Sequence, residues 1–384
     1  MKIATLMLVS TPYFVTRYTA FTQAFPDCSL HSIELGRTSL TYPWKAHDDE
    51  LPYQRWVLTE TAAESESTVN LVKALFRVLN QIQPDAMAIA GYAIPTMSAA
   101  LLWCIWNRKP VIMFSDSKAD DAARSWWKEL PKRLILSQYQ GALVAGKPHR
   151  RYLAQLGMSE ASMLTGYDVV DNAAFHPSKI RSRPKPYARP FFLAINRFVP
   201  KKNLLNLVLA YAKYRRAVGE SAWDLVLCGD GELRSRIEAE LARLAIRDSV
   251  HLTGFLEQQD ILPLYAHASC FIHASIQEQW GLVVNEAMAA GLPVLVSTHC
   301  GCFEDLLVEG VNGFGFEPEN VEQLSALMRQ MSSDSVDLKA MGQASLQMIQ
   351  KFSPADFAQG LHDAIDHAAC QLTKSNLLAF EKKS

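Results

Sequence analysis

The sequence predicts an α/β protein of two domains, each a doubly wound parallel β-sheet with helices on both faces. The chain has 384 residues, which is too long for one comfortable hydrophobic core and suits two domains of about 100 to 200 residues each. From Phe191 onward, short β-rich runs alternate with longer helical runs, as is typical of parallel sheets. A proline-rich basic segment, residues 176–190, separates the two halves.

The second half shows this alternation most clearly. Its predicted strands are Phe191–Ile195, Asp224–Cys228, Val250–Thr253, Cys270–His273 and Pro293–Val296. Its predicted helices are Leu204–Val218, Leu233–Leu244, Ile261–His267 and Leu282–Ala290, the last capped by Gly291. Because ligands of parallel sheets bind at the carboxyl ends of the strands, the residues that follow these strands are the candidate site.

The first half repeats the pattern less regularly. Its predicted strands are Ile3–Val9, Val111–Phe114 and Ala142–Val144, and its predicted helices are Thr68–Gln81 and Pro95–Asn107. Four prolines in 176–190 predict a stiff, non-helical linker, since proline lacks a backbone N–H. We therefore expect an N-terminal domain at 1–183, a C-terminal domain at 184–355, and a helix at 356–384 that packs back on the N-terminal domain.

Composition favours an ordinary soluble enzyme of a reducing cytosol. Hydrophobic residues make up 49% and charged residues 20%, with a net charge of −1, which argues against disorder and against a nucleic-acid partner. No apolar run approaches the roughly 18 residues of a spanning helix, and the run at Ile3–Val9 resembles a strand more than a signal peptide. Seven cysteines without paired C-x-x-C units argue against a zinc site, and the C-x-C of Cys300 and Cys302 is interpreted as packing thiols, with metal binding as the alternative.

A basic segment directly follows the predicted strand Phe191–Ile195. It runs from Asn196 to Asn203 and leads into a helix. A proline within it prevents the strand from continuing, which leaves Arg197 and Lys202 to converge on one anion such as a diphosphate. A solvated basic loop is the competing interpretation.

A glycine-rich turn follows the next strand, with Gly229 and Gly231 on either side of an aspartate. These glycines allow backbone to approach a ligand or simply let the chain turn. The turn matches neither G-x-G-x-x-G nor the P-loop, which argues against a dinucleotide enzyme or an ATPase.

The most informative segment is E-Q-W-G-L-V-V-N-E, which begins at Glu278. Glu278 follows the strand Cys270–His273, Gly281 permits a close turn, and a helix opens near Leu282 with free N–H groups that favour an anion. Glu286 lies further along in an apolar run, where a carboxylate needs hydroxyl or cationic partners. Ribose hydroxyls would satisfy it, and so would a structural arginine.

These motifs together resemble the retaining glycosyltransferases of family four, which have the two-domain GT-B fold and carry an E-x7-E motif. The resemblance covers most of 190–316, through R-x-x-x-x-K-N at Arg197, G-D-G-E-L at Gly229, H-L-T-G-F at His251, E-Q-W-G-L-V-V-N-E-A-M-A-A-G-L-P-V at Glu278 and G-x-x-E at Gly301. It implies two Rossmann-like domains facing each other across a cleft, with the nucleotide-sugar donor in the second domain and the acceptor in the first.

The resemblance also implies a role for each matching position. Arg197 and Lys202 would hold the donor diphosphate and stabilise the departing nucleotide, Glu278 would contact the donor sugar, and Glu286 would bind the ribose hydroxyls. The remaining donor-site residues would be Gly229, Phe255 and Leu256, the last two beside the nucleobase, and the backbone of Gly281, Leu282 and Val283. The family usually needs neither metal nor cofactor, usually retains the anomeric configuration, and requires no enzymic nucleophile.

The first half departs from the family's pattern, which leaves the acceptor side open. Ser115-Asp116-Ser117-Lys118 stands where many relatives have a histidine. Asp116 is our candidate for the missing catalytic contact, and Lys147 and His149 are further candidates. A helix cap at Asp116 and a solvated face at Lys147 are the alternatives.

A basic surface is predicted from Arg124 to Arg151, where Arg, Lys and Glu count as seven positive and one negative, beside Trp126 and Trp127. Cations next to tryptophan suit lipid headgroups, which gives the hypothesis of peripheral docking at the inner face of the cytoplasmic membrane. Tryptophans in the core with solvated cations are the alternative.

The favoured function is hexosyl transfer from a nucleotide-sugar, UDP-sugar in preference to GDP-sugar, to a saccharide or lipid-linked saccharide. A small-molecule acceptor is one alternative. A catalytically silent nucleotide-sugar-binding subunit is another, disfavoured because Arg197, Lys202, Glu278 and Glu286 occur together.

Overall fold

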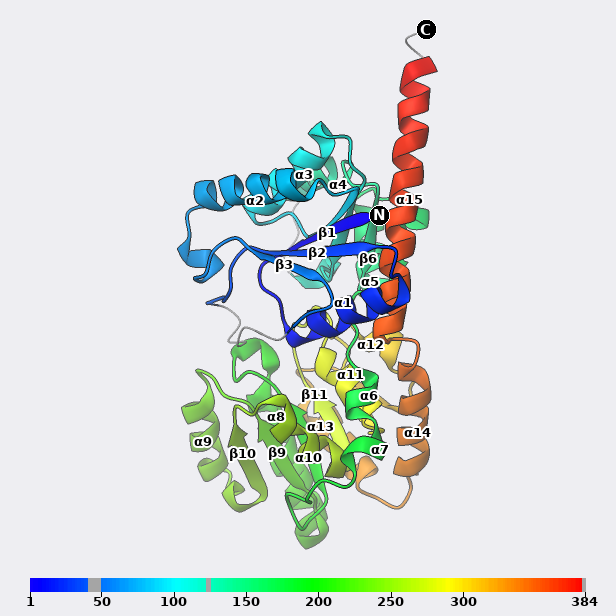
Figure 1. Ribbon diagram of the computed structural model, residues 1–384. Coiled ribbons are helices and arrows are strands. Elements are labelled where there is room, and N and C mark those ends of the chain that lie inside the picture. The colour runs from blue at the N-terminus through cyan, green and yellow to red at the C-terminus, as the bar shows by residue number, and fades with distance from the viewer. Residues whose placement is uncertain (41–49, 122–125, 382–384) are drawn as a thin grey trace. The chain divides into compact units, whose positions relative to one another are not determined.

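The protein consists of two compact units, one of which is interrupted by the other in the sequence. The computed structural model describes residues 1–40, 50–121 and 126–381. The first unit combines Met1–Val170 with Ser353–Ser384, and the second is Asp171–Phe352. Figure 1 shows a twisted sheet with flanking helices in each unit.

The first unit contains a seven-stranded parallel sheet in the order β3-β2-β1-β4-β5-β6-β7. Its strands are β1 Lys2–Met7, β2 Ser29–Glu34, β3 Gln54–Val57, β4 Ala86–Ala90, β5 Val111–Ser115, β6 Gly141–Val144 and β7 Met163–Thr165. Its α-helices are α1 Pro12–Ala24, α2 Thr68–Ile82, α3 Pro95–Trp106, α4 Trp126–Leu136, α5 Lys147–Gln155 and α15 Pro354–Glu381. The strand order reverses direction next to β1, as it does in doubly wound sheets.

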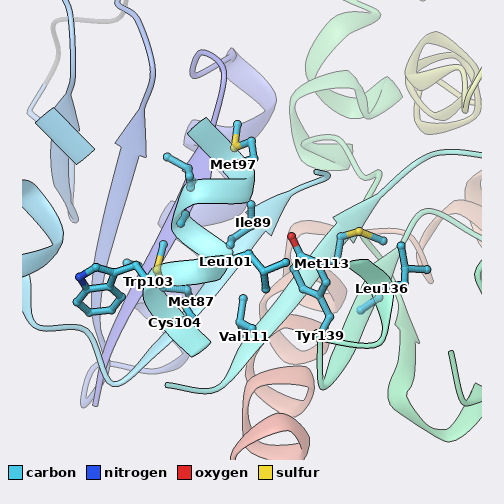
Figure 2. Close-up of a cluster of buried hydrophobic side chains, with 14 of the residues drawn as sticks. Met87, Ile89, Met97, Leu101, Trp103, Cys104, Val111, Met113, Leu136 and Tyr139 are labelled. Carbon is cyan, nitrogen blue, oxygen red and sulfur yellow. The ribbon is translucent and has the colours of Figure 1, made fainter. Parts of the chain in front are cut away.

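The core of the first unit lies between the sheet and its crossover helices. Figure 2 shows Met87 and Ile89 of β4 and Val111 and Met113 of β5 packed with side chains of α3. These strands are apolar on both faces because helices cover both sides of a parallel sheet. Helix α15 packs against α1 and β4–β7, so the end of the chain completes the first unit.

The second unit contains a six-stranded parallel sheet in the order β10-β9-β8-β11-β12-β13. Its strands are β8 Phe191–Ile195, β9 Asp224–Cys228, β10 Val250–Gly254, β11 Cys270–His273, β12 Val294–Ser297 and β13 Gly313–Phe316. Its α-helices are α6 Asn172–Phe175, α7 Pro177–Ile180, α8 Leu204–Val218, α9 Arg234–Arg243, α10 Gln258–His267, α11 Leu282–Ala289, α12 Phe303–Leu306, α13 Val321–Met331 and α14 Leu338–Ile349. Both sheets are therefore of the predicted Rossmann-like type.

The segment 176–190 is not free of helix, contrary to expectation. Helix α7 begins at Pro177, where the missing N–H costs nothing because the first helical N–H groups have no intrahelical partner. The His176 ring caps this turn by accepting from the Ser178 N–H. The prediction was wrong because proline is unfavourable in the interior of a helix but is tolerated in its first turn.

The segment 171–183, which we assigned to the first domain, belongs to the second unit. Asn172 donates from Nδ2 to the Ile349 carbonyl at 2.9 Å and to the Phe352 carbonyl at 3.2 Å. Both carbonyls lie at the end of the second unit, so Asn172 joins the first and last segments of that unit.

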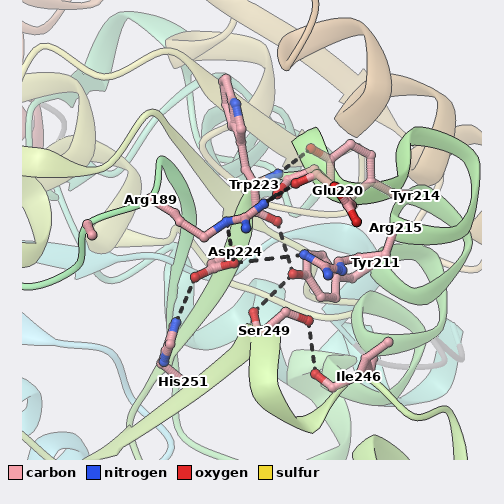
Figure 3. Close-up of polar contacts among 12 residues, drawn as sticks. Arg189, Tyr211, Tyr214, Arg215, Glu220, Trp223, Asp224, Ile246, Ser249 and His251 are labelled. Carbon is pink, nitrogen blue, oxygen red and sulfur yellow. Dashed lines mark hydrogen bonds and ion pairs between the residues drawn. The ribbon is translucent and has the colours of Figure 1, made fainter.

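A buried carboxylate fixes the chain just before β8. Asp224 opens β9, and Figure 3 shows it between Arg189, Arg215 and His251. Arg189 Nε lies 3.4 Å from Asp224 Oδ1, and His251 Nε2 lies 3.0 Å from Asp224 Oδ2. Because Asp224 is the first residue of β9 and His251 is the second residue of β10, the cluster lies at the amino edge of the sheet, away from the carboxyl edge where ligands bind.

Candidate functional site

Two side chains predicted from separate motifs meet at the carboxyl edge of the second sheet. Lys202 lies in the short turn after β8, and Glu278 lies in the loop after β11. Strands β8 and β11 are neighbours and parallel, so their carboxyl ends share one edge. Lys202 Nζ forms an ion pair with Glu278 Oε2, and the two side chains are only 12% and 11% exposed.

Two further residues donate to the same carboxylate oxygen. His273, the last residue of β11, places Nε2 3.0 Å from Glu278 Oε2. Ser275 Oγ donates to that oxygen at 3.1 Å. Glu278 Oε2 therefore accepts from an ammonium, an imidazole and a hydroxyl at once.

These donors decide the ionisation of the cluster. Burial alone would raise the pKa of Glu278, but the His273 hydrogen bond and the Lys202 charge outweigh burial and hold that pKa well below its usual range. Burial lowers the pKa of His273, against the opposing effect of Glu278. Near neutral pH the cluster thus contains a carboxylate, an ammonium and a neutral imidazole that donates through Nε2.

The loop that carries Glu278 is held on both sides. The Gly301 N–H donates to the Glu278 carbonyl at 3.1 Å, and the Cys302 N–H donates to the Trp280 carbonyl at 3.1 Å. Trp280 Nε1 donates to Asn285 Oδ1 of α11 at 2.9 Å, and this bond is buried. The loop is therefore anchored to the chain after β12 and to the helix that follows it.

Gly281 is required by the geometry of this loop. Its φ of +109° lies in the left-handed region, and a Cβ there would sit 3.3 Å from His273 Nε2 and 3.5 Å from Cys302 Sγ. Helix α11 begins at the next residue. Within the described residues, the amides of Leu282 and Val283 have no hydrogen-bond acceptor, which leaves two donors at the helix N-terminus.

Glu286, the second predicted carboxylate, is buried on α11 and is 7% exposed. The Tyr265 hydroxyl of α10 donates to Glu286 Oε2 at 2.7 Å. The sequence predicted either a hydroxyl or a cationic partner for this carboxylate, and the Tyr265 side chain provides the hydroxyl.

The other predicted donor-site residues occupy the same edge of the second sheet. Arg197 is exposed directly after β8, and Phe255 and Leu256 follow β10, where the Phe255 side chain is 61% exposed. Gly229 follows β9 with a φ of +128°, and a Cβ there would lie 1.9 Å from the Asn196 carbonyl oxygen. Packing against Asn196 thus requires a glycine at 229 whether or not a ligand binds.

In the first unit, Asp116 directly follows β5 at the carboxyl edge of that sheet. Part of its side chain reaches solvent. The pKa of its carboxyl group is nevertheless raised to about 7, mainly because the surrounding protein displaces water from the carboxyl group and secondly because the Asp168 carboxylate repels its negative charge. Of the further candidates on α5, Lys147 is exposed and His149 is fully buried.

The predicted basic surface falls partly outside the described residues, since Arg124 does so and the Trp126 side chain is not described. Trp127, Leu130 and Leu134 of α4 are 59%, 55% and 66% exposed. Trp127 is therefore not a core residue. None of the helices in the described part of the chain has the length and hydropathy needed to span a bilayer.

Sequence reasoning missed His273, Ser275 and Tyr265. A usable signal existed for His273, because a histidine at the end of an otherwise apolar strand, beside the candidate loop, must find a polar partner. Tyr265 carried no such signal, since tyrosine is common on the buried face of a helix.

Comparisons with known proteins place the candidate site within a segment that matches a known family. Residues 176–348, nearly the whole second unit, match the family model of the glycosyl transferases group 1. An uncharacterized glycosyltransferase of Methanocaldococcus jannaschii is 34% identical over 110 residues, which cover 29% of this chain and 28% of that protein. The MMP alpha-(1->4)-mannosyltransferase of Mycolicibacterium hassiacum is 26% identical over 241 residues, which cover 59% of this chain and 56% of that protein. The chain thus spans less than two thirds of these relatives.

Solved structures show the same fold over nearly the whole chain. The Anabaena protein HepE in complex with UDP superposes with a TM-score of 0.74 at 17% identity, covering 95% of this chain and 100% of that chain. A structure of the same Anabaena protein in complex with UDP-glucose gives a TM-score of 0.72. The chain has the GT-B fold of two Rossmann-like domains, as the sequence predicts, and its second unit carries a glycosyl transferases group 1 domain.

Proposed function

We propose that this protein is a retaining glycosyltransferase that moves a hexosyl group from a nucleotide-sugar, a UDP-sugar in preference to a GDP-sugar, to a saccharide or lipid-linked saccharide. The observation that carries the proposal is the buried cluster of Lys202, Glu278, His273 and Ser275 at the carboxyl edge of the sheet, inside the segment that matches glycosyl transferases group 1. The UDP complex of the Anabaena structure favours uridine as the base.

In the donor complex, we assign the diphosphate to Lys202, Arg197 and the free amides of Leu282 and Val283. A diphosphate carries more charge than one carboxylate, so it competes with Glu278 for the Lys202 ammonium. Glu278 then accepts a hydroxyl of the sugar, and Glu286 accepts the ribose hydroxyls. The remaining contacts are those expected from the sequence: Phe255 and Leu256 beside the base, with Gly229 and Gly281 allowing close approach of the backbone.

The chemistry follows from where charge develops. As the bond from the anomeric carbon to the diphosphate breaks, negative charge grows on the leaving phosphate, and Lys202 and Arg197 stabilise it. The acceptor hydroxyl attacks the anomeric carbon from the same face, and its proton passes to the leaving phosphate oxygen. The proposal assigns neither metal nor cofactor to this step.

The acceptor site is proposed for the first unit. Asp116 lies at the carboxyl edge of its sheet, where ligands of parallel sheets bind, and its raised pKa suits a carboxyl group that shares a proton with an acceptor hydroxyl. A small-molecule acceptor remains the second candidate, since Asp116 would serve either kind of hydroxyl.

We further propose that the protein acts in the cytoplasm and docks on the inner face of the membrane through α4 and α5, within Arg124 to Arg151. Trp127, Leu130 and Leu134 are three and four residues apart, so they lie on one face of α4, and all three are exposed. Lys132 and Arg133 lie between Leu130 and Leu134 in the sequence. Flotation with anionic liposomes at low salt is expected to carry the protein upward, and Trp127→Ser to reduce the floating fraction several-fold. An absence of wild-type flotation would contradict docking without touching the transferase assignment.

The function is tested by calorimetric titration of the purified protein with UDP, GDP and ADP. We expect UDP to bind, and Glu286→Ala to lose at least tenfold in affinity because the ribose hydroxyls lose their acceptor. Tyr265→Phe is the matched control, since it removes the protein's own hydroxyl from Glu286 and leaves the carboxylate. If no nucleotide and no nucleotide-sugar binds the folded protein, the transferase proposal fails.

A catalytically silent binding subunit is distinguished by turnover. If the protein is a transferase, we expect it to release UDP from UDP-sugar without acceptor by slow transfer to water, whereas a silent subunit binds the donor and leaves it intact. Lys202→Met should abolish that release.

A further inference from the structure

The hydrogen bonds on Glu278 are distributed unevenly between its two oxygens. Lys202, His273 and Ser275 all contact Oε2. Within the described residues, no group donates to Oε1. One oxygen is therefore saturated by the protein, and the other is available to a ligand.

His273 is the most rigid of the three donors. It is fully buried at the end of β11, and its ring stacks near Phe271 with an interplanar angle of 14°. Ser275 Oγ also lies 3.3 Å from His273 Nε2. Gly281 leaves no space for another side chain on that side, since a Cβ there would meet the ring. Lys202, in contrast, carries its ammonium on a flexible stem.

We propose that His273 is a positioning residue, which orients Glu278 by donating Nε2–H to Oε2 so that Oε1 is presented to a hydroxyl of the donor sugar. This rests on the proposed function. His273 itself does not touch the ligand.

The donor complex is where this bond matters most. Once the diphosphate takes the Lys202 ammonium, Glu278 loses its cation while remaining buried, and an unpaired buried carboxylate is costly. The buried carboxyl group would then be more stable protonated than ionised. A protonated Glu278 would have no fixed orientation, because either oxygen could carry the proton. His273 and Ser275 remain after Lys202 leaves, and they keep the carboxylate ionised with Oε2 engaged.

The test compares two amides of different reach. In His273→Gln, the new side-chain amide nitrogen can occupy the place of the imidazole Nε2, whereas the shorter amide of His273→Asn corresponds to Nδ1 and cannot reach Glu278. Both variants and the wild type are titrated with UDP and with UDP-glucose, UDP-N-acetylglucosamine and GDP-mannose, and release of the nucleotide from the sugar that binds is followed from pH 5 to 9.

We expect UDP affinity to stay within about threefold of wild type in both variants, since UDP lacks the transferred hexosyl group that Glu278 is proposed to contact. His273→Asn should lose about 10- to 100-fold in kcat/KM for the nucleotide-sugar, the range for a hydrogen bond to a charged group, while His273→Gln recovers most of it. The acid limb of the pH profile should move to higher pH in His273→Asn only, because losing a donor raises the pKa of Glu278.

Other results overturn the inference. Equal turnover and equal pH profiles in all three proteins would show that Glu278 is positioned without His273. Parallel losses of UDP affinity and thermal stability in both variants would assign His273 to packing alone. If the wild-type protein binds neither nucleotide nor nucleotide-sugar, the proposed function fails, and this inference fails with it. If the wild-type protein turns over the nucleotide-sugar and both variants do so equally well, only the role of His273 is refuted. Should His273→Asn fail to fold, Ser275→Ala provides the second test, with a smaller loss and the same rise of the acid limb.

Discussion

At the scale of single residues, Lys202 has one anionic partner in the structure, Glu278, and a second one in the proposed donor complex. Without donor it neutralises Glu278, and with donor it is assigned to the diphosphate. The structure thus explains why both charges lie in a nearly buried position before any ligand binds: each offsets the free-energy cost of burying the other. The sequence predicted that Lys202 and Arg197 converge on an anion, but the pairing with Glu278 brings together segments 76 residues apart, which no local pattern reveals.

Removing the lysine tests both roles. Lys202→Met leaves the Glu278 carboxylate without its cation and should lower the free energy of unfolding at pH 7 by about 3 kcal/mol, the lower range for breaking a buried pair. UDP affinity should fall at least tenfold. Lys201→Met is the matched control, because it removes the same charge from the neighbouring position, and chemical denaturation together with calorimetry measures both effects. Unchanged UDP affinity would exclude Lys202 from the diphosphate site.

The pH dependence of stability distinguishes the paired from the unpaired carboxylate. The pKa of Glu278 is depressed in the folded protein, so its contribution to stability is present above the unfolded pKa of about 4.3 and is lost as the pH falls below it. Lys202→Met raises the folded pKa toward the unfolded value. Its unfolding free energy should therefore decline less steeply than that of wild type between pH 5 and pH 3, as urea titrations across that range can show.

At the scale of elements, the ends of the central strands depend on glycine. Gly229→Ala would place Cβ 1.9 Å from the Asn196 carbonyl oxygen at a φ of +128°, so the ends of β8 and β9 must separate. We expect a loss of about 3 kcal/mol or more from overpacking and backbone strain together. Gly219→Ala has a φ of +75° with nothing within 4 Å, and it should lose only the backbone-strain component, about 1 to 2 kcal/mol. Similar losses in the two variants would contradict the steric argument.

The elements themselves were predicted best in the second unit, where strands and helices alternate regularly, whereas in the first unit even the apolar strand β4 was missed. Strands β8, β9 and β11 and helix α8 have the predicted bounds, since the strands are short and mostly apolar and α8 lies between Asn203 and Gly219. Strand β2 escaped prediction because His31, Ser32 and Glu34 in it are buried, and polar residues inside a strand hide its apolar pattern. Arg55 of β3 neutralises Glu34 at 2.8 Å, a pairing that exists only once the two strands are neighbours.

At the scale of the whole molecule, the discontinuous first unit ties both ends of the chain into one core. Phe357 of α15 is fully buried and lies with its ring near Tyr18 of α1 and Phe114 of β5. Arg17 stacks over the same ring, and its guanidinium is paired with Asp168. The C-terminal helix is thus a component of the first unit's core, although the whole second unit separates it in sequence from the rest.

This arrangement predicts that damage to α15 stays within the first unit. Phe357→Ala should destabilise that unit by about 3 to 5 kcal/mol, as for other buried aromatics, and Gln359→Ala, on the exposed face of the same helix, should have little effect. Native-state hydrogen exchange measures the outcome element by element. Amides of β4, β5 and β6 should exchange faster in Phe357→Ala, while those of β8, β9 and β11 keep their wild-type protection, because each unit buries a core of its own. Faster exchange in both sheets would instead mean that the two units unfold as one cooperative body, and the proposed donor site could then be lost through a substitution in either of them.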